Sequence, residues 1–187
     1  MSNPIDTISG WKYIETDPSW PVLGKKKILQ TFDNLSLPQD GYFVIGGANL
    51  VLRDIKPATP DVDMLVSSDV FDILKRLRNS IVKEPPEAAR LRGADNKTVW
   101  VKNDHTPVPI SATTMLGDGY YPMSFESHKD RTELISGVQC LELDQVVLAK
   151  EALQRLKDVD DLEAIARFMG RSLNLSKPIL IEPIFES

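Results

Sequence analysis

Two aspartates, Asp61 and Asp63, are separated by one residue in a short segment that opens with Pro60. Side chains alternate between the two faces of a strand, so both carboxylates would point the same way if this segment is extended. Two adjacent anions repel each other unless a cation lies between them, and carboxylate oxygens are the ligands that Mg²⁺ and Mn²⁺ bind. The spacing therefore predicts a divalent-metal site at Asp61 and Asp63.

A glycine pair, Gly46 and Gly47, ends the apolar run that precedes these aspartates. Glycines let a backbone turn approach phosphate oxygens closely where a helix begins. A tight strand-to-helix turn with no ligand would explain the same two glycines. Asn49, just inside the expected helix, would either hydrogen-bond a phosphate or cap the helix. Glycines and aspartates together indicate a metal-dependent nucleotide site.

The Gly46-Gly47 pair followed by Asp61-x-Asp63 resembles the nucleotidyltransferase superfamily, whose fold is polymerase-beta-like. A second segment, residues 143–165, resembles small prokaryotic members, including the toxins of abortive-infection and related toxin–antitoxin pairs. The residues that match there are Lys150, Ala152, Arg155, Lys157, Asp158 and Asp161. The resemblance covers roughly residues 40–168. It implies an α/β (α+β) fold with a short mixed sheet flanked by helices.

The resemblance also implies a set of site residues. Asp61 and Asp63 would be catalytic and would hold Mg²⁺ or Mn²⁺. The residues that would bind the nucleotide are Gly46, Gly47, Asn49, Lys150 and Lys157. The family usually has a third carboxylate on a later strand, and the best candidate strand here, residues 108–112, offers Ser111 at that position. Asp104 and Asp118 flank this strand as possible substitutes.

Lys150 lies on the apolar side of the helix expected to begin near Asp144. A lysine within an apolar stripe either packs its stem and extends its ammonium to water, or meets a specific anion. Here that anion would be a phosphate or the Asp61 and Asp63 pair. Lys157 would share this helix face if the helix continues that far, whereas Arg155 would form an ion pair with Asp158 or Asp161.

Apolar periodicity and turn residues predict the arrangement of elements. We expect helices at residues 22–35, 48–54 and 68–78, strands at 42–45, 61–66, 98–102 and 108–113, and an extended segment at 134–143. A helix from Asp144 to about Leu156 and a second from Asp158 or Asp160 would form a C-terminal pair. The chain would thus comprise an extended segment (1–20), an α/β core (21–143), the helix pair (144–170) and an irregular tail (171–187).

Composition limits the class of protein. The chain has 187 residues, a net charge of −5 and a single cysteine, Cys140. No apolar run is long enough to span a bilayer, the N-terminus lacks a signal segment, and the lone cysteine suits a reducing compartment, so we expect a cytoplasmic protein. The acidic balance argues against bulk attraction to nucleic acid, although a local basic patch would still serve a nucleotide or a tRNA end.

The predicted function is transfer of a nucleoside monophosphate from an NTP, with Mg²⁺, to a protein side chain, a tRNA end or a small molecule. Because Ser111 stands where an acid is expected, the alternative is a catalytically silent module of the same fold that binds a nucleotide or a protein partner. An antitoxin or a second copy of the chain would be further partners.

Overall fold

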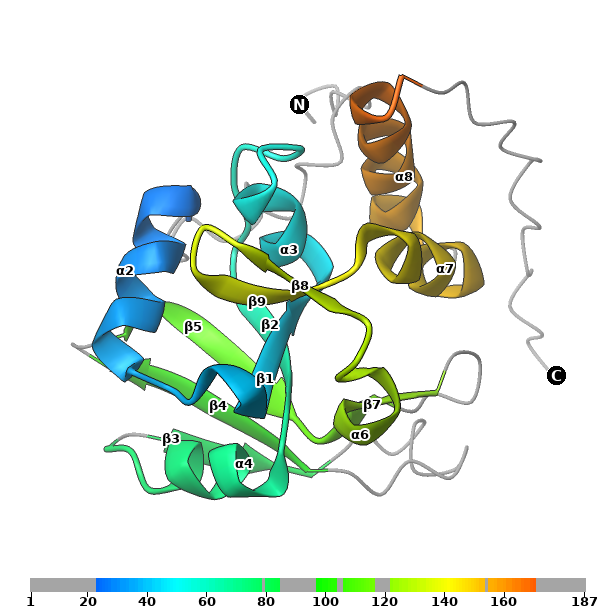
Figure 1. Cartoon of the computed structure of the whole chain (residues 1–187). Coiled ribbons are helices and arrows are strands. Elements are labelled where there is room, and N and C mark those ends of the chain that lie inside the picture. Colours follow the sequence, from blue (N-terminus) through cyan, green and yellow to red (C-terminus); the bar gives the residue numbers. More distant parts are fainter. Residues whose placement is uncertain are drawn as a thin grey trace, which may run out of the picture.

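The computed structural model describes residues 23–78, 80–84, 97–103, 106–116, 122–153 and 155–170 (Figure 1). The helices are α2 (Lys25–Leu35), α3 (Gly46–Leu52), α4 (Ser68–Lys75), α6 (Phe125–His128), α7 (Leu143–Leu153) and α8 (Leu156–Phe168). The strands are β1 (Tyr42–Ile45), β2 (Val62–Val66), β3 (Ser80–Lys83), β4 (Thr98–Asn103), β5 (Thr106–Thr113), β6 (Met115–Leu116), β7 (Met123–Ser124), β8 (Thr132–Ile135) and β9 (Val138–Leu141). A short 3₁₀ turn, Gln39–Gly41, precedes β1.

One mixed sheet forms the centre of the fold. Its seven strands are in the order β3-β4-β5-β2-β1-β9-β8. The β2–β5 and β1–β9 pairs are parallel, and the other four neighbouring pairs are antiparallel. The mixed sheet was predicted, but it is wider than expected, because β3 and the β8–β9 hairpin add strands at its two edges.

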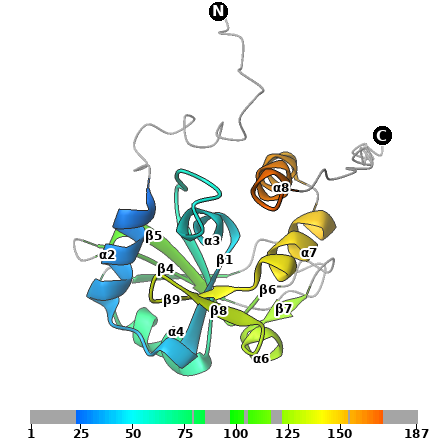
Figure 2. The same ribbon diagram turned by 45° about the horizontal axis from the view of Figure 1, so that its top comes forward.

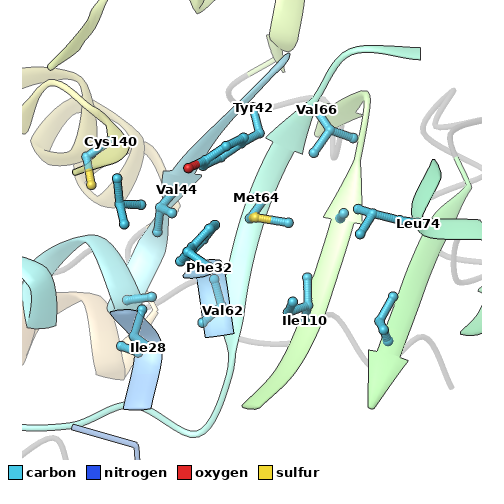
Figure 3. Close-up of a cluster of buried hydrophobic side chains, with 14 of the residues drawn as sticks. Ile28, Phe32, Tyr42, Val44, Val62, Met64, Val66, Leu74, Ile110 and Cys140 are labelled. Carbon is cyan, nitrogen blue, oxygen red and sulfur yellow. The ribbon is translucent and has the colours of Figure 1, made fainter. Parts of the chain in front are cut away.

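One face of the sheet is covered by α2 and α4. Alternate residues of β2 point into this layer, and Val62, Met64 and Val66 are each fully buried in it. Figure 3 shows these side chains with Ile28 and Phe32 of α2. The aromatic rings of Phe32 and Tyr42 stack with their centroids 5.2 Å apart. Burial of this face fixes the register of β2, and a one-residue slip would exchange its two faces.

The opposite face carries a second apolar cluster that joins the C-terminal helices to the sheet. Figure 2 shows α6, α7 and α8 on the side of the sheet away from α2. The cluster consists of Phe43, Ile45, Leu50, Leu65, Met123, Phe125, Leu141, Val146 and Ile165. It covers β1 and part of β2. Because Asp63 lies between the buried Val62 and Met64, alternation places its side chain on this second face.

Several predicted elements are confirmed with small shifts of their ends. The helix predicted at 68–78 is α4, and Ser67 caps its start, since the Ser67 side chain accepts a hydrogen bond from the backbone N–H of Val70. The extended segment predicted at 134–143 is the end of β8, a turn and β9, with Ser136 and Gly137 both at positive φ. The expectations for residues 1–20 and 171–187 lie outside the described residues.

Three features differ from the prediction or were missed. The first helix of the pair ends at Leu153 rather than near Leu156, and α8 begins at Leu156 rather than at Asp158 or Asp160. The sequence did not indicate β3, nor the small β6–β7 sheet that leads into α6. Within the described residues, none of the helices combines the length and the apolar character needed to cross a membrane.

Candidate functional site

The glycine turn and the aspartate pair meet at one end of the sheet. Ile45, the last residue of β1, pairs with Asp63 of β2, so Gly46 begins beside Asp63. Gly46 has a φ of +61°, and a Cβ placed there would lie 3.3 Å from Oδ2 of Asp63. A Cβ on Gly47 would lie 2.7 Å from Oγ1 of Thr59. A side chain at Gly46 would therefore be strained and would crowd the Asp63 carboxylate, and one at Gly47 would clash with Thr59.

Asp61 and Asp63 are held partly buried and close enough to repel each other. Burial, and then the charge of Asp63, raise the pKa of Asp61 from its usual value to about 7. Burial also raises the pKa of Asp63, although nearby cations and a hydrogen bond from the Ser111 hydroxyl oppose this rise. Within the described residues, the carboxylate of Asp61 makes no direct hydrogen bond or ion pair. The predicted aspartate pair is thus a concentration of incompletely compensated negative charge.

Four cations surround this pair without neutralising it directly. The charges that act on Asp61 are those of Lys157 and Lys56, and Asp63 is affected by Lys157, Arg155 and Lys150. Lys56 also lies beside the glycine turn, because its Nζ would be 4.0 Å from a Cβ on Gly47. Sequence reasoning missed Lys56, which lies in an irregular connection where no pattern distinguishes it from other surface lysines.

The side chain of Lys150 is held by ion pairs within the protein. Its side chain is only 7% exposed, and Nζ donates to Asp161 Oδ2 at 2.7 Å and to Asp158 Oδ1 at 3.1 Å. Asp158 and Asp161 were not among the partners predicted for Lys150. Its ammonium is withdrawn from water and does not contact the Asp61 and Asp63 carboxylates directly. Contact between Lys150 and a phosphate stays a prediction.

Lys157 and Arg155 do not share a helix with Lys150. Since α7 ends before them, the expected common face of Lys150 and Lys157 is wrong; Lys157 lies in the first turn of α8. The Arg155 ion pair with Asp158 is confirmed, with Nε 2.7 Å from Oδ2. The same carboxylate oxygen accepts the backbone N–H of Arg155 at 3.2 Å and caps the start of α8. This arrangement brings Lys157 near Asp61 and Asp63 from a separate element.

Ser111, the residue at the third-carboxylate position that the resemblance implies, lies next to Asp63. The parallel pairing of β2 and β5 places Asp63 opposite Ser111, and the Ser111 hydroxyl hydrogen-bonds the Asp63 carboxylate. Ile110 and Ala112 are fully buried on the other face, so Ser111 points to the face that carries Asp63. Asp104 and Asp118, the possible substitutes, lie outside the described residues.

The side chain of Asn49 is occupied by structural hydrogen bonds. Nδ2 donates to the carbonyls of Val44 at 3.0 Å and Leu141 at 2.9 Å, and Oδ1 accepts from Nε of Arg53 at 2.7 Å. The residue is fully buried and links α3 to β1 and β9. These hydrogen bonds of Asn49 hold α3, and therefore the glycine turn at its start, against the sheet. A direct contact between Asn49 and a nucleotide stays a prediction.

The donor set suits a hard divalent cation. Asp61 and Asp63 supply oxygen ligands, and the described residues contain no group of three or more His, Cys, Asp or Glu side chains arranged to hold a metal. A cation that binds here would relieve the repulsion between the two carboxylates. It would have to complete its coordination with a ligand's oxygens and water, a combination typical of Mg²⁺ at phosphate sites.

Comparison with known proteins identifies the fold. No protein-family model and no curated protein matches the sequence. Among solved structures, TM1012 from Thermotoga maritima, provisionally assigned as a nucleotidyltransferase, is similar with a TM-score of 0.50 and 13% identity, over 78% of this chain and 91% of that one. JHP933 from Helicobacter pylori gives a TM-score of 0.46 and 12% identity, over 76% of this chain and 64% of JHP933. We base the fold on the first: the chain has a nucleotidyltransferase-like fold, as its sequence predicts.

The raised pKa of Asp61 predicts a dependence of stability on pH in the metal-free protein. A carboxyl group whose pKa is higher in the folded state binds its proton more tightly there, so it favours folding below about pH 4 and loses this contribution as the pH rises to about 7. In EDTA, we expect the free energy of unfolding of wild type to fall between pH 5 and 8 relative to Asp61→Asn. Urea denaturation measures it. Asp130→Asn, at an exposed site, should follow wild type, and identical pH profiles for all three proteins would contradict the prediction.

Lys150→Met should destabilise the protein, because it leaves Asp158 and Asp161 with one fewer partner in a buried environment. Removing one member of a buried ion pair typically costs about 3–5 kcal/mol, and here Arg155 and Lys56 should retain part of the compensation. We therefore expect a loss of roughly 2–3 kcal/mol in chemical denaturation. Lys129→Met, which removes an exposed ion pair, is the matched control and should have little effect. An unchanged stability in Lys150→Met would show that the buried pairs contribute nothing.

Proposed function

We propose that this protein is a metal-dependent nucleotidyltransferase that takes an NTP as its donor. The observation that carries the proposal is the incompletely compensated pair Asp61 and Asp63 beside the open turn at Gly46 and Gly47. The nucleotidyltransferase-like fold supports it, because this fold places both motifs at one end of the sheet. The residues named for the nucleotide are Gly46 and Gly47, with Lys56 and Lys157 close to the same end.

Asp61 and Asp63 would hold Mg²⁺ or Mn²⁺, which when bound supplies charge screening and alignment for the phosphates. Because the glycine turn carries no side chains, it would let the β- and γ-phosphates approach the backbone beside Asp63, and Lys56 lies next to this turn. Lys157 adds positive charge from α8. Together these residues would favour a triphosphate whose α-phosphate lies over Asp63.

The proposed reaction transfers a nucleoside monophosphate group from the NTP to the acceptor. An acceptor hydroxyl oxygen attacks the α-phosphorus, the bond from that phosphorus to the bridging oxygen breaks, and pyrophosphate leaves with the electron pair. The hydroxyl proton passes to water or a base. In phosphoryl transfer the attacking and leaving oxygens lie roughly in line, so positioning and electrostatic stabilisation supply most of the catalysis.

Ser111 favours a second candidate function, a module of this fold that binds a nucleotide or a protein partner without catalysis. A serine hydroxyl is neither an anionic ligand nor a strong base, and a positioned general base typically contributes about 10²–10⁴-fold in rate. The two functions share the metal and NTP site and differ only in product. Incubation with α-labelled NTP, Mn²⁺ and candidate acceptors, followed by detection of pyrophosphate and labelled product, separates them.

The aspartate pair predicts metal-dependent nucleotide binding. Calorimetry with Mn²⁺ and a non-hydrolysable NTP should show binding by wild type that Asp61→Asn with Asp63→Asn abolishes, because the variant lacks the carboxylate charge that attracts the cation. Asp69→Asn with Asp72→Asn removes the same charge from α4, beyond the opposite end of β2, and should bind as wild type does. Equal affinity in both double variants would rule out a metal site at Asp61 and Asp63.

Ser111→Asp tests the missing carboxylate. Because Ser111 already contacts Asp63, an aspartate there would face the metal site. We expect Mn²⁺ binding at least as tight as in wild type and, where wild type transfers slowly, a rate higher by up to about 10²-fold. Ser111→Ala, the control, should keep nucleotide binding and gain no activity. A wild type as fast as Ser111→Asp would show that another group already performs this role.

A further inference from the structure

Four side chains form a row along the second face of the sheet, the face that carries Asp63, starting at the candidate metal site. Asp63 of β2 pairs with Ser111 of β5, Ser111 pairs with Trp100 of β4, and Trp100 pairs with Ile81 of β3. Directly paired residues in neighbouring strands point to the same face. Since strands lie about 4.8 Å apart, the Cα of Trp100 is roughly 10 Å from that of Asp63.

The far end of this row is an aromatic and cationic surface. Trp100 is partly exposed, and Ile81 beside it is 59% exposed. Nζ of Lys83, also exposed, lies 4.4 Å from the centroid of the Trp100 ring. The residues facing the other way, Val99 and Val101, are fully buried and fix the orientation of β4. A large aromatic ring held by the sheet with a lysine at its face is a combination that recurs where proteins bind nucleotides.

The geometry of in-line transfer relates this surface to the reaction; this step rests on the proposed function. The glycine turn follows β1, on one side of Asp63, and Ser111 and Trp100 lie on the other side. If the pyrophosphate leaves over Gly46 and Gly47, the attacking hydroxyl must approach from the opposite side of the α-phosphate. That direction leads over Ser111 to Trp100.

We propose that Trp100 and Lys83 form the acceptor subsite and that the acceptor is a nucleotide, either free or at the end of a nucleic acid strand. Its base would stack on Trp100. Its phosphate would form an ion pair with Lys83, which would replace the contact between Lys83 and the Trp100 ring. An exposed cation–π contact is weak, so an anionic phosphate can displace it. A cationic acceptor such as an aminoglycoside would be repelled by Lys83. The net charge of −5 favours an acceptor that presents few phosphates.

Fluorescence of 2-aminopurine, which stacking quenches, tests the subsite. One probe is 2-aminopurine ribonucleoside monophosphate, and the other is a short single-stranded RNA with 2-aminopurine at its 3′ end. Both are titrated in Mn²⁺ and saturating non-hydrolysable NTP, so that the donor site is filled. Tighter binding of the RNA would identify a strand end as the source of the acceptor, and equal binding would identify the free nucleotide.

Trp100→Ala should weaken binding of the preferred probe by about ten- to a hundredfold. Trp100→Phe keeps a ring and should lose less, and Lys83→Gln should lose severalfold and show a smaller dependence on salt. Leu134→Ala, at the opposite edge of the same sheet, and Lys26→Gln, on α2, are matched controls that should bind as wild type does. Circular dichroism and thermal melting establish that each variant folds. If Trp100→Ala does not fold, the results for Trp100→Phe and for Lys83→Gln decide the outcome.

Calorimetry with Mn²⁺ and the non-hydrolysable NTP separates failure of this inference from failure of the proposed function. NTP binding that survives in Trp100→Phe and Lys83→Gln, with probe binding reduced, supports the acceptor subsite. If wild type binds NTP but neither probe, or if the variants bind the probes normally, the subsite is refuted and the donor site stands. If the variants lose NTP binding as well, Trp100 belongs to the donor site. A wild type that binds no NTP refutes the proposed function and, with it, the acceptor role.

Discussion

The ion pairs of Asp161 hold the candidate site together. Its two carboxylate oxygens accept Lys56 at 2.9 Å and Lys150 at 2.7 Å. Lys56 belongs to the connection between α3 and β2 that leads to Asp61, whereas Lys150 and Asp161 belong to α7 and α8. One buried carboxylate therefore ties both C-terminal helices to the segment that precedes Asp61 and Asp63. Because these buried charges compensate one another, loss of one contact weakens the others.

This network also decides which charges remain uncompensated. Asp158 and Asp161 engage Lys150, Arg155 and Lys56 directly, so these cations act on Asp61 and Asp63 only through space. Asp61 and Asp63 consequently lie near positively charged side chains that form no direct ion pair with them. Folding keeps two like charges together at a cost in stability, and a bound cation would recover that cost. Such local conflict is a feature of functional sites in otherwise well-compensated proteins.

The sequence predicted the parts of this arrangement that depend on local pattern. Strand alternation predicted that Asp61 and Asp63 share one face, and the resemblance to nucleotidyltransferases implied that Ser111 stands at the position of the third carboxylate. The break between α7 and α8 was predicted, but its exact position could not be, because residues 150–158 contain neither Gly nor Pro; the position depends on Asp158 capping the backbone N–H of Arg155. The edge strand β3 escaped detection because its side chains are mostly exposed and carry little periodic signal. Pairing of Trp100 with Ser111 is a tertiary fact that no local pattern contains.

The parallel pairing of β2 with β5 has a consequence for how the chain folds. Between these two strands the chain must pass through α4, turn at the sheet edge in β3 and return through β4 before β5 can align with β2. Residues so distant in sequence can pair only after a long loop has closed. The entropy cost of this closure is offset only when the pairing is complete, so these contacts form late and slow folding. The acidic pair and its serine neighbour would thus come together only in the last stage of assembly. The hydrogen bond from the Ser111 hydroxyl to Asp63 would then form only when the central sheet is complete.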